Sequence, residues 1–264
     1  MKPAPFDYAA PESLGDALAL LDDESRPLAG GQSLVPMLNF RLARPARLVD
    51  LERVAALAFL DAADGPLRIG AMTRQATLER SKLVAERWPL LHQAVRLVGH
   101  AAIRSRGTVG GSVAHADPKA ELPVALAALG ARFHVRSATG ARTLSADELF
   151  QGPLTTALEP DELLVEIEVP PLPAGTGTAF VEQARTHGDF AIAGAAAVAA
   201  PGRAAIALLG AAPVPVRATE AELALDGGAS PAEAGELAAA DVADAYRRAL
   251  LTALTRRAIE AATT

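Results

Sequence analysis

Apolar and polar positions follow two different periods along the chain, and these periods predict where helices and strands lie. Residues 13–22 carry apolar side chains at helical spacing, and Ser13 is a suitable N-cap for that helix. The apolar segments 26–29 and 47–51 have the length of short strands, and residues 32–40 between them are predicted to form a loop or a short helix. Strand, crossover and strand in that order predict a parallel βαβ unit.

A second stretch mixes helices with further strands. Helices are predicted over residues 73–79, 88–97 and 119–129, and strands over 67–70, 132–136, 140–144 and 163–169. Asp117-Pro118 is predicted to start the third of these helices, with Asp at the N-cap and proline at the first helical position. Residues 104–118 are rich in glycine and show little periodicity, so no regular element is predicted there.

Residues 170–177 form the clearest boundary, because three prolines and two glycines there interrupt any helix or strand ladder. Strands are predicted afterwards over residues 179–184, 191–200 and 204–210, and helices from Thr219 to the C-terminus with a break at Gly227-Gly228. We therefore predict a first domain over residues 1–170, with subdomains of about 1–55 and 56–170, and a C-terminal domain over 171–264.

Composition narrows the possible chemistry. The chain has 264 residues, a formal net charge of -6 and only ten aromatic residues, so we expect one or two domains with a core of small aliphatic side chains. It has no cysteine, which excludes a disulfide, a thiolate zinc site, a cysteine nucleophile and a Cys-ligated iron–sulfur cluster. The acidic balance argues against nucleic acid as a partner.

No segment has the features of a signal peptide. The longest nearly apolar runs, residues 122–131 and 190–200, fall short of the roughly 18–20 residues that span a bilayer. The sequence therefore predicts a soluble cytoplasmic protein without a membrane span.

Two glycine-rich loops are the main candidates for ligand binding. They are Ala29-Gly30-Gly31-Gln32-Ser33-Leu34 and Gly107-Thr108-Val109-Gly110-Gly111-Ser112. Paired glycines let the backbone approach a ligand closely, and successive N–H groups can converge on an oxyanion. Together the loops could grip the two ends of one pyrophosphate; the alternative is two tight turns packed against neighbouring backbone. Neither loop has the Rossmann or the Walker pattern.

Other candidate patterns carry less chemistry. His115, Asp117 and Glu121 follow the second loop, but the five histidines form no H-x-x-x-H or H-E-x-x-H pattern, so we predict no metal site. Ser33 does not lie in a G-x-S-x-G pattern, so no hydrolytic triad is indicated.

Two further segments have two interpretations each. Arg104-Ser105-Arg106 could face a phosphate or belong to the solvated surface. Phe190 could stack on a flat ring, although a core position is the favoured interpretation from the residues alone.

The two loops in this order, with their neighbours, resemble the flavoprotein (medium) subunit of the molybdenum hydroxylases, the family of xanthine dehydrogenase and aerobic carbon monoxide dehydrogenase. The first loop with Arg41-Leu42 and Leu48-Val49-Asp50 is similar to the first FAD-binding segment of that family, and residues 103–118 resemble the second almost residue for residue. Further similarity is found at residues 161–164, Arg185, 188–191 and 246–247.

This resemblance implies a fold and cofactors. The fold class is α+β: a vanillyl-alcohol-oxidase-like (PCMH-type) FAD-binding domain of two α/β subdomains, followed by a small C-terminal antiparallel sheet with helices. The cofactor is FAD, bound non-covalently. Molybdopterin and [2Fe-2S] clusters are implied only for partner subunits, and no residue of this chain is implied to be catalytic, because the flavin carries the chemistry.

The resemblance also implies roles for individual residues. Backbone amides of residues 29–33 and 108–112 would hold the pyrophosphate, with Val98 and Gly99 near the flavin and Leu164 near the adenine. Glu121 would bond the ribose, where the family usually has Asp. The complete set of implied FAD contacts is Ala29, Gly30, Gly31, Gln32, Ser33, Leu34, Val98, Gly99, Thr108, Gly110, Gly111, Ser112, His115, Asp117, Glu121, Leu164 and Phe190.

The function implied is electron transfer within a complex. The molybdopterin large subunit would pass electrons to the [2Fe-2S] small subunit, and the small subunit would pass them to the FAD of this chain. The electrons would then leave to NAD, a quinone or oxygen. Two alternatives stay open: a self-contained FAD oxidoreductase, for which the length leaves little room for a substrate domain, and a flavin-free scaffold subunit, which the Glu121 departure keeps open.

Overall fold

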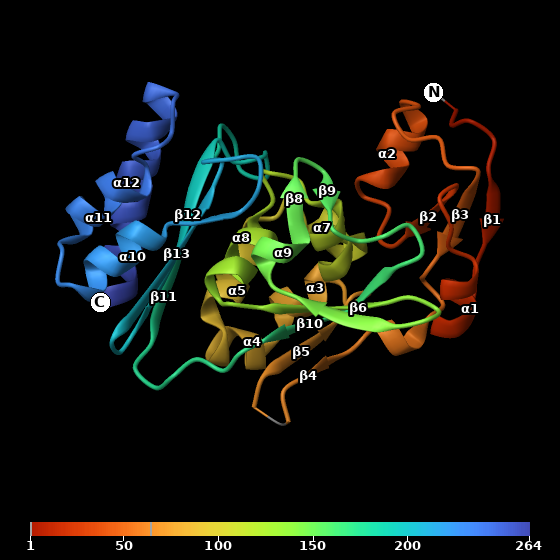
Figure 1. Ribbon diagram of the computed structural model, residues 1–264, viewed down its shortest axis with the longest axis horizontal. Helices are drawn as coiled ribbons and strands as arrows, with labels where there is room; N and C mark the ends of the chain where they lie inside the picture. Colours follow the sequence, from red (N-terminus) through yellow and green to blue (C-terminus); the bar gives the residue numbers. More distant parts are fainter. Residues whose placement is uncertain (1, 64) are drawn as a thin grey trace.

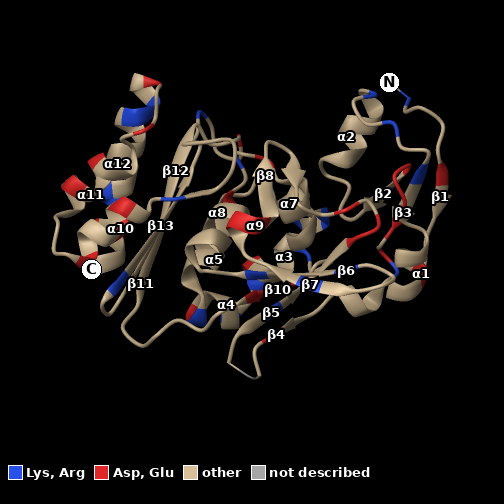
Figure 2. Ribbon diagram, in the orientation of Figure 1, with Lys and Arg blue, Asp and Glu red and all other residues tan. Residues whose placement is uncertain are grey.

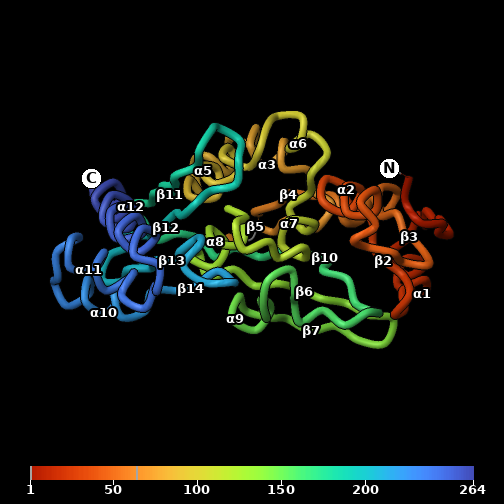
Figure 3. The backbone as a smooth tube through the Cα atoms, turned by 90° about the horizontal axis from the view of Figure 1, so that it is seen from above, coloured from red at the N-terminus to blue at the C-terminus, as the bar shows by residue number. Residues whose placement is uncertain are grey.

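The computed structural model describes residues 2–63 and 65–264, arranged as three units in a row (Figures 1 and 3). The first unit is a parallel sheet in the order β1-β3-β2, formed by Asp7–Ala9, Arg47–Asp50 and Ser25–Leu28. Helix α1 (Leu14–Ala19) follows β1, and α2 (Leu34–Asn39) connects β2 to β3. The predicted parallel βαβ unit is thus confirmed, and so is the N-cap, because the Ser13 hydroxyl accepts a hydrogen bond from the Asp16 amide.

The second unit, in the middle of the molecule, is built on an antiparallel sheet in the order β4-β5-β10-β6-β7. These strands are Leu60–Asp61, Leu67–Gly70, Leu163–Val169, Arg132–Arg136 and Ala141–Leu144. One face of the sheet packs on helices, since Phe133 and Ile167 are fully buried in one cluster with helix residues such as Leu91. The other face carries charged side chains and is open. The predicted strands of this unit are confirmed within a residue or two.

The helices of this unit lie between β5 and β6 along the chain. They are α3 (Gln75–Arg80), α4 (Lys82–Arg87), α5 (Pro89–Leu97), α6 (Ala101–Arg106), α7 (Val109–His115) and α8 (Glu121–Ala128). The short elements that complete the unit are a 3-10 turn η1 (Ala55–Leu57), α9 (Ala146–Leu149), β8 (Phe150–Gly152) and β9 (Thr155–Thr156).

Several features of this unit differ from the sequence prediction, which includes no helix at α4, α6, α7 or α9. Helix α7 lies in the glycine-rich segment, and its Gly110 packs closely on Ala71, the residue after β5: a Cβ on Gly110 would lie 2.7 Å from the Ala71 Cα. The prediction that Asp117-Pro118 starts a helix is wrong, since α8 begins at Glu121. The Asp117 carboxylate instead accepts a hydrogen bond of 2.9 Å from the Lys119 amide, which closes an Asx turn.

The third unit is an antiparallel sheet in the order β11-β12-β13-β14, covered by helices on both faces. The strands are Gly177–Gln183, Ala193–Ala200, Arg203–Leu209 and Val216–Arg217, and the helices that follow are α10 (Thr219–Asp226), α11 (Pro231–Ala238) and α12 (Ala245–Thr263). Along β12, Ala195 and Ala197 face α12 while Ala196 and Val198 face the central unit. Small side chains on both faces explain the alanine-rich sequence of this strand.

Within positions 2–63 and 65–264, no helix is both long and apolar enough to cross a membrane. The division of the chain at residue 170 stays a prediction, although the Pro- and Gly-rich segment does lie between β10 and β11.

Candidate functional site

A cavity of about 1270 Å³ lies between the first unit and the central unit. Its volume exceeds the roughly 300–1,000 Å³ typical of sites for compact small molecules, so it suits a long ligand. Both glycine-rich loops line it, as do residues from α8, β10 and the loop before β12. All seventeen residues that the sequence suggested as ligand contacts line this one cavity.

The two loops touch each other at the cavity wall. A Cβ on Gly30 would lie 2.3 Å from the Arg106 carbonyl oxygen and 2.8 Å from the Gly107 Cα. Only glycine permits this approach of backbone to backbone. Gly31 has a φ of 73°, in the left-handed region that favours glycine. The first loop therefore needs both of its glycines, for different reasons.

The loops differ in the hydrogen-bond donors that they offer. Within the described residues, the N–H groups of the first loop from Gly30 to Leu34 donate to no protein group. In the second loop the Val109 and Gly110 amides donate to the Thr73 and Ala71 carbonyls, both at 2.9 Å, and the Gly111 amide donates to the Thr108 hydroxyl at 3.0 Å. The structure thus leaves amide donors mainly in the first loop, and in the second loop it leaves the hydroxyls of Thr108 and Ser112.

Arg104 has a different role from both that the sequence suggested. It is buried and forms a two-point ion pair with Glu79, at 2.8 and 2.9 Å, and this hydrogen-bonded pairing holds the pKa of Glu79 below its usual range. Arg104 also donates to the carbonyls of Val98 (2.9 Å) and Gly99 (3.1 Å), which line the cavity. It therefore holds the cavity wall rather than facing a phosphate or solvent.

Replacing Arg104 by alanine is expected to lower the free energy of unfolding by about 3 kcal/mol, because it leaves the Glu79 carboxylate unpaired in a partly buried place. Urea denaturation followed by the fluorescence of the single tryptophan, Trp88, measures this. The exposed Arg106 is the matched control, and Arg106→Ala is expected to change stability by less than about 0.5 kcal/mol. Equal effects of the two substitutions would contradict the assigned role of Arg104.

Glu121 is a buried acid in the wall of the cavity. It is the first residue of α8, its exposed fraction is 5%, and its carboxyl hydrogen-bonds no other described residue. Burial raises the pKa of this carboxyl to about 8, with smaller contributions from the charges of Glu182 and Asp117, while its own backbone N–H opposes the shift. A neutral acid both donates and accepts hydrogen bonds, which suits a ligand hydroxyl.

Phe190 lies at the rim of the cavity with 64% of its surface exposed. The interpretation of Phe190 as a core residue is therefore wrong. It sits at the end of a turn in which the Thr186 hydroxyl donates to the Asp189 carboxylate at 2.6 Å, and Gly188, with a φ of 87°, packs against the His100 ring. This turn places the exposed Phe190 ring among the residues that line the cavity.

Sequence reasoning missed Gln75. This residue lines the cavity, and its buried side-chain oxygen has no hydrogen-bond partner among residues 2–63 and 65–264. In the sequence Gln75 lies within a predicted helix and carries no motif, so no signal marks it.

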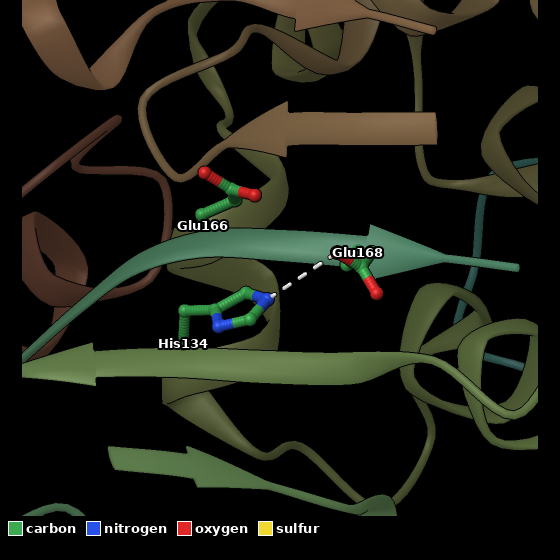
Figure 4. Close-up of side chains that lie close together, drawn as sticks. All are labelled: His134, Glu166 and Glu168. Atoms are coloured by element: carbon green, nitrogen blue, oxygen red, sulfur yellow. Dashed lines mark ion pairs between the residues drawn. The ribbon is translucent and has the colours of Figure 1, made fainter. Parts of the chain in front are cut away.

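A second polar cluster lies outside the cavity, on the open face of the central sheet (Figure 4). Ligand atoms of His134, Glu166 and Glu168 lie within 4.8 Å of one another. Both oxygens of Glu166 accept hydrogen bonds of 2.7 Å from Arg68, and the His134 Nε2 atom lies 3.8 Å from Glu168. The cluster is thus a set of cross-strand pairs that stabilise the sheet.

Comparison with known proteins identifies relatives along most of the chain. The family described as "FAD binding domain in molybdopterin dehydrogenase" matches residues 4–172. The alpha subunit of the 6-hydroxypseudooxynicotine dehydrogenase complex of Paenarthrobacter nicotinovorans is 46% identical over 84% of this chain and 78% of its own. The carbon monoxide dehydrogenase medium chain of Afipia carboxidovorans is 38% identical over 99% of this chain and 98% of its own.

Solved structures agree with these matches. A chain of carbon monoxide dehydrogenase from Hydrogenophaga pseudoflava superposes with a TM-score of 0.93 at 39% identity, covering 99% of this chain and 98% of that one. The similarity confirms the predicted α+β fold, the FAD cofactor and the oxidoreductase class. The chain therefore belongs to the family of FAD-binding medium subunits of the molybdenum hydroxylases.

Proposed function

We propose that this chain is the electron-transfer subunit of a three-part molybdenum hydroxylase. It takes electrons from the [2Fe-2S] clusters of a small partner subunit and passes them to an external acceptor such as NAD, a quinone or oxygen. A large partner subunit with molybdopterin hydroxylates the substrate. Relatives named as medium subunits or as subunits of dehydrogenase complexes support this arrangement.

One observation carries the proposal: two glycine loops touch each other in the wall of one cavity, and the first keeps a run of unpaired amides. Gly30 has no room for a side chain, and the N–H groups from Gly30 to Leu34 are free to bind an anion. This donor set fits the pyrophosphate of FAD, and the Thr108 and Ser112 hydroxyls of the second loop add further donors. We assign the seventeen cavity residues that the sequence suggested as the FAD contacts.

The remaining contacts fit the two ends of the same molecule. Bound FAD supplies the electron storage, and the chain supplies binding and orientation. Val98 and Gly99, held by Arg104, line the flavin end, where the exposed ring of Phe190 is free to cover the flavin. Glu121 bonds the ribose and Leu164 contacts the adenine. The chain has no cysteine, and we propose that His115 contacts FAD without a covalent bond.

The proposal is tested with the FAD-loaded chain under anaerobic conditions. Adding the reduced [2Fe-2S] subunit of its complex should bleach the flavin absorbance, and adding an acceptor should restore it. The same chain without the partner should stay oxidised in the presence of candidate organic substrates. Bleaching by a small substrate alone would instead establish the self-contained oxidoreductase.

A further inference from the structure

Gln75 is a buried polar residue in the cavity wall that the assigned FAD contacts leave unused. Its exposed fraction is 4%, and its side-chain oxygen has no hydrogen-bond partner among the residues that the structure describes. Leaving a buried polar atom unpaired is costly, and native proteins pair almost all such atoms. Because Gln75 also lines the cavity, a molecule bound there is the partner that its carboxamide fits.

Packing fixes the Gln75 side chain against the start of the second loop. The Gln75 backbone N–H donates to the Gly107 carbonyl at 2.9 Å. A Cβ on Gly107 would lie 2.6 Å from the Gln75 side-chain oxygen and 3.0 Å from the carbon that carries it, so the carboxamide rests on the Gly107 Cα. The carboxamide can turn over about its last bond, which brings either its oxygen or its nitrogen to the cavity.

Gly107 joins the first loop to the wall of the flavin end. A Cβ on Gly30 would lie 2.8 Å from the Gly107 Cα, so the first loop adjoins Gly107. The Ile103 carbonyl oxygen adjoins it too, at 3.1 Å from the Cβ position of Gly107, and the Ile103 side chain packs on Gly99. Gln75 rests on the same glycine, and therefore lies near the junction between the amides assigned to the pyrophosphate and the residues assigned to the flavin. In FAD the ribityl chain connects these two groups.

The two loops at this junction offer hydrogen bonds rather than charged side chains. Residues 27–40 and 107–116, which include most of both loops and their surroundings, contain no Lys, Arg, Asp or Glu (Figure 2). The ribityl chain is a neutral polyol, and each of its hydroxyls both donates and accepts a hydrogen bond. The free N–H groups of the first loop can only donate, whereas the carboxamide of Gln75 can also accept. Gln75 thus complements the first loop for a ligand that carries hydroxyls.

We propose that the Gln75 carboxamide binds the ribityl hydroxyls of FAD and is a specificity-determining contact for the flavin half of the cofactor. This inference rests on the proposed function, because it takes the cavity residues assigned there to be the FAD contacts. Gln75 should therefore distinguish ligands with a ribityl chain, such as FAD and FMN, from ADP, which shares only the adenosine and the pyrophosphate of FAD.

The test compares these three ligands by calorimetric titration of the whole chain. Gln75→Leu removes the hydrogen bonds and keeps a side chain of similar size. The affinities for FAD and for FMN should each fall about 10-fold, whereas the affinity for ADP should stay unchanged. Gln75→Met, with an unbranched apolar side chain, should give the same pattern. Gln151→Leu is the matched control, since Gln151 is exposed and does not line the cavity, and it should leave all three affinities unchanged.

The stability of the FAD-free chain separates a ligand contact from a structural role. Gln75→Leu should unfold at the same or a higher urea concentration than the original chain, because it removes an unpaired buried polar atom. An equal loss of affinity for FAD, FMN and ADP would overturn the inference, since Gln75 would then shape the pyrophosphate cradle. Unchanged affinity for FAD would overturn it as well. Failure of the original chain itself to bind FAD would instead contradict the proposed function.

Discussion

Replacing Gly30 by alanine is expected to weaken FAD binding at least about 100-fold. The new Cβ would lie 2.3 Å from the Arg106 carbonyl oxygen and 2.9 Å from its carbonyl carbon, and both are backbone atoms that no rotamer change can move. The two glycine loops would have to separate, which breaks the cradle for the pyrophosphate and misplaces the first-loop amides. Titration of FAD into the variant, followed by quenching of flavin fluorescence, measures the loss.

Gly140 provides the matched control for this substitution. A Cβ at this position meets no atom within 4 Å, and its φ is not in the left-handed region. Gly140→Ala should therefore bind FAD as the original chain does, with stability changed by less than about 0.5 kcal/mol. If Gly30→Ala also bound FAD with the original affinity, the contact between the loops could not be what shapes the site.

The second large effect concerns Glu121 and pH. Burial raises the pKa of Glu121 from 4.5 to about 8, so the folded chain without FAD holds this proton more tightly than the unfolded chain. The tightly held proton of Glu121 contributes to the free energy of unfolding. This contribution is fully present below about pH 4.5 and is lost as pH rises through about 8. Glu121→Gln keeps the hydrogen-bonding shape but cannot ionise. At about pH 8.5 this variant should be more stable than the original chain by about 2–4 kcal/mol, measured by urea denaturation.

The difference between the two chains isolates Glu121 from other groups. Burial also raises the pKa of Glu182, to about 7, so both chains should lose some stability over the same range. Only the loss due to Glu121 should disappear in Glu121→Gln. FAD affinity of the original chain should also fall as pH rises through about 8, since an ionised Glu121 would lie in the same cavity as the charged pyrophosphate. Parallel stability curves for the two chains would contradict this account of Glu121.

The sequence predicts the parts of the fold whose signal is local. Strands 26–29 and 47–51 are short, mostly apolar runs on either side of a short connection, and the structure confirms their parallel pairing. Helix α7 carries no such signal: its Gly110 and Gly111 are required by close packing on Ala71 and by the Thr108 cap, and glycine does not indicate a helix.

The site shows the same division. The residues that the resemblance suggests as FAD contacts all line one cavity. The resemblance also implies that second-loop amides bind the pyrophosphate, but in the structure several of these amides donate to other groups of the protein. The role of Arg104 depends on Glu79, which lies 25 residues away and adjoins it only after α3 and α6 pack together. The place of Gln75 in the cavity wall is likewise a product of tertiary structure, which no short motif records.

The central claim is that the two loops form one FAD site, and a titration tests it most directly. FAD added to the purified, flavin-free chain should bind with a stoichiometry of about one per chain and quench its fluorescence, and acid precipitation should release all of it to the supernatant. A chain that remains colourless and leaves FAD fluorescence unchanged at saturating concentration would contradict the account.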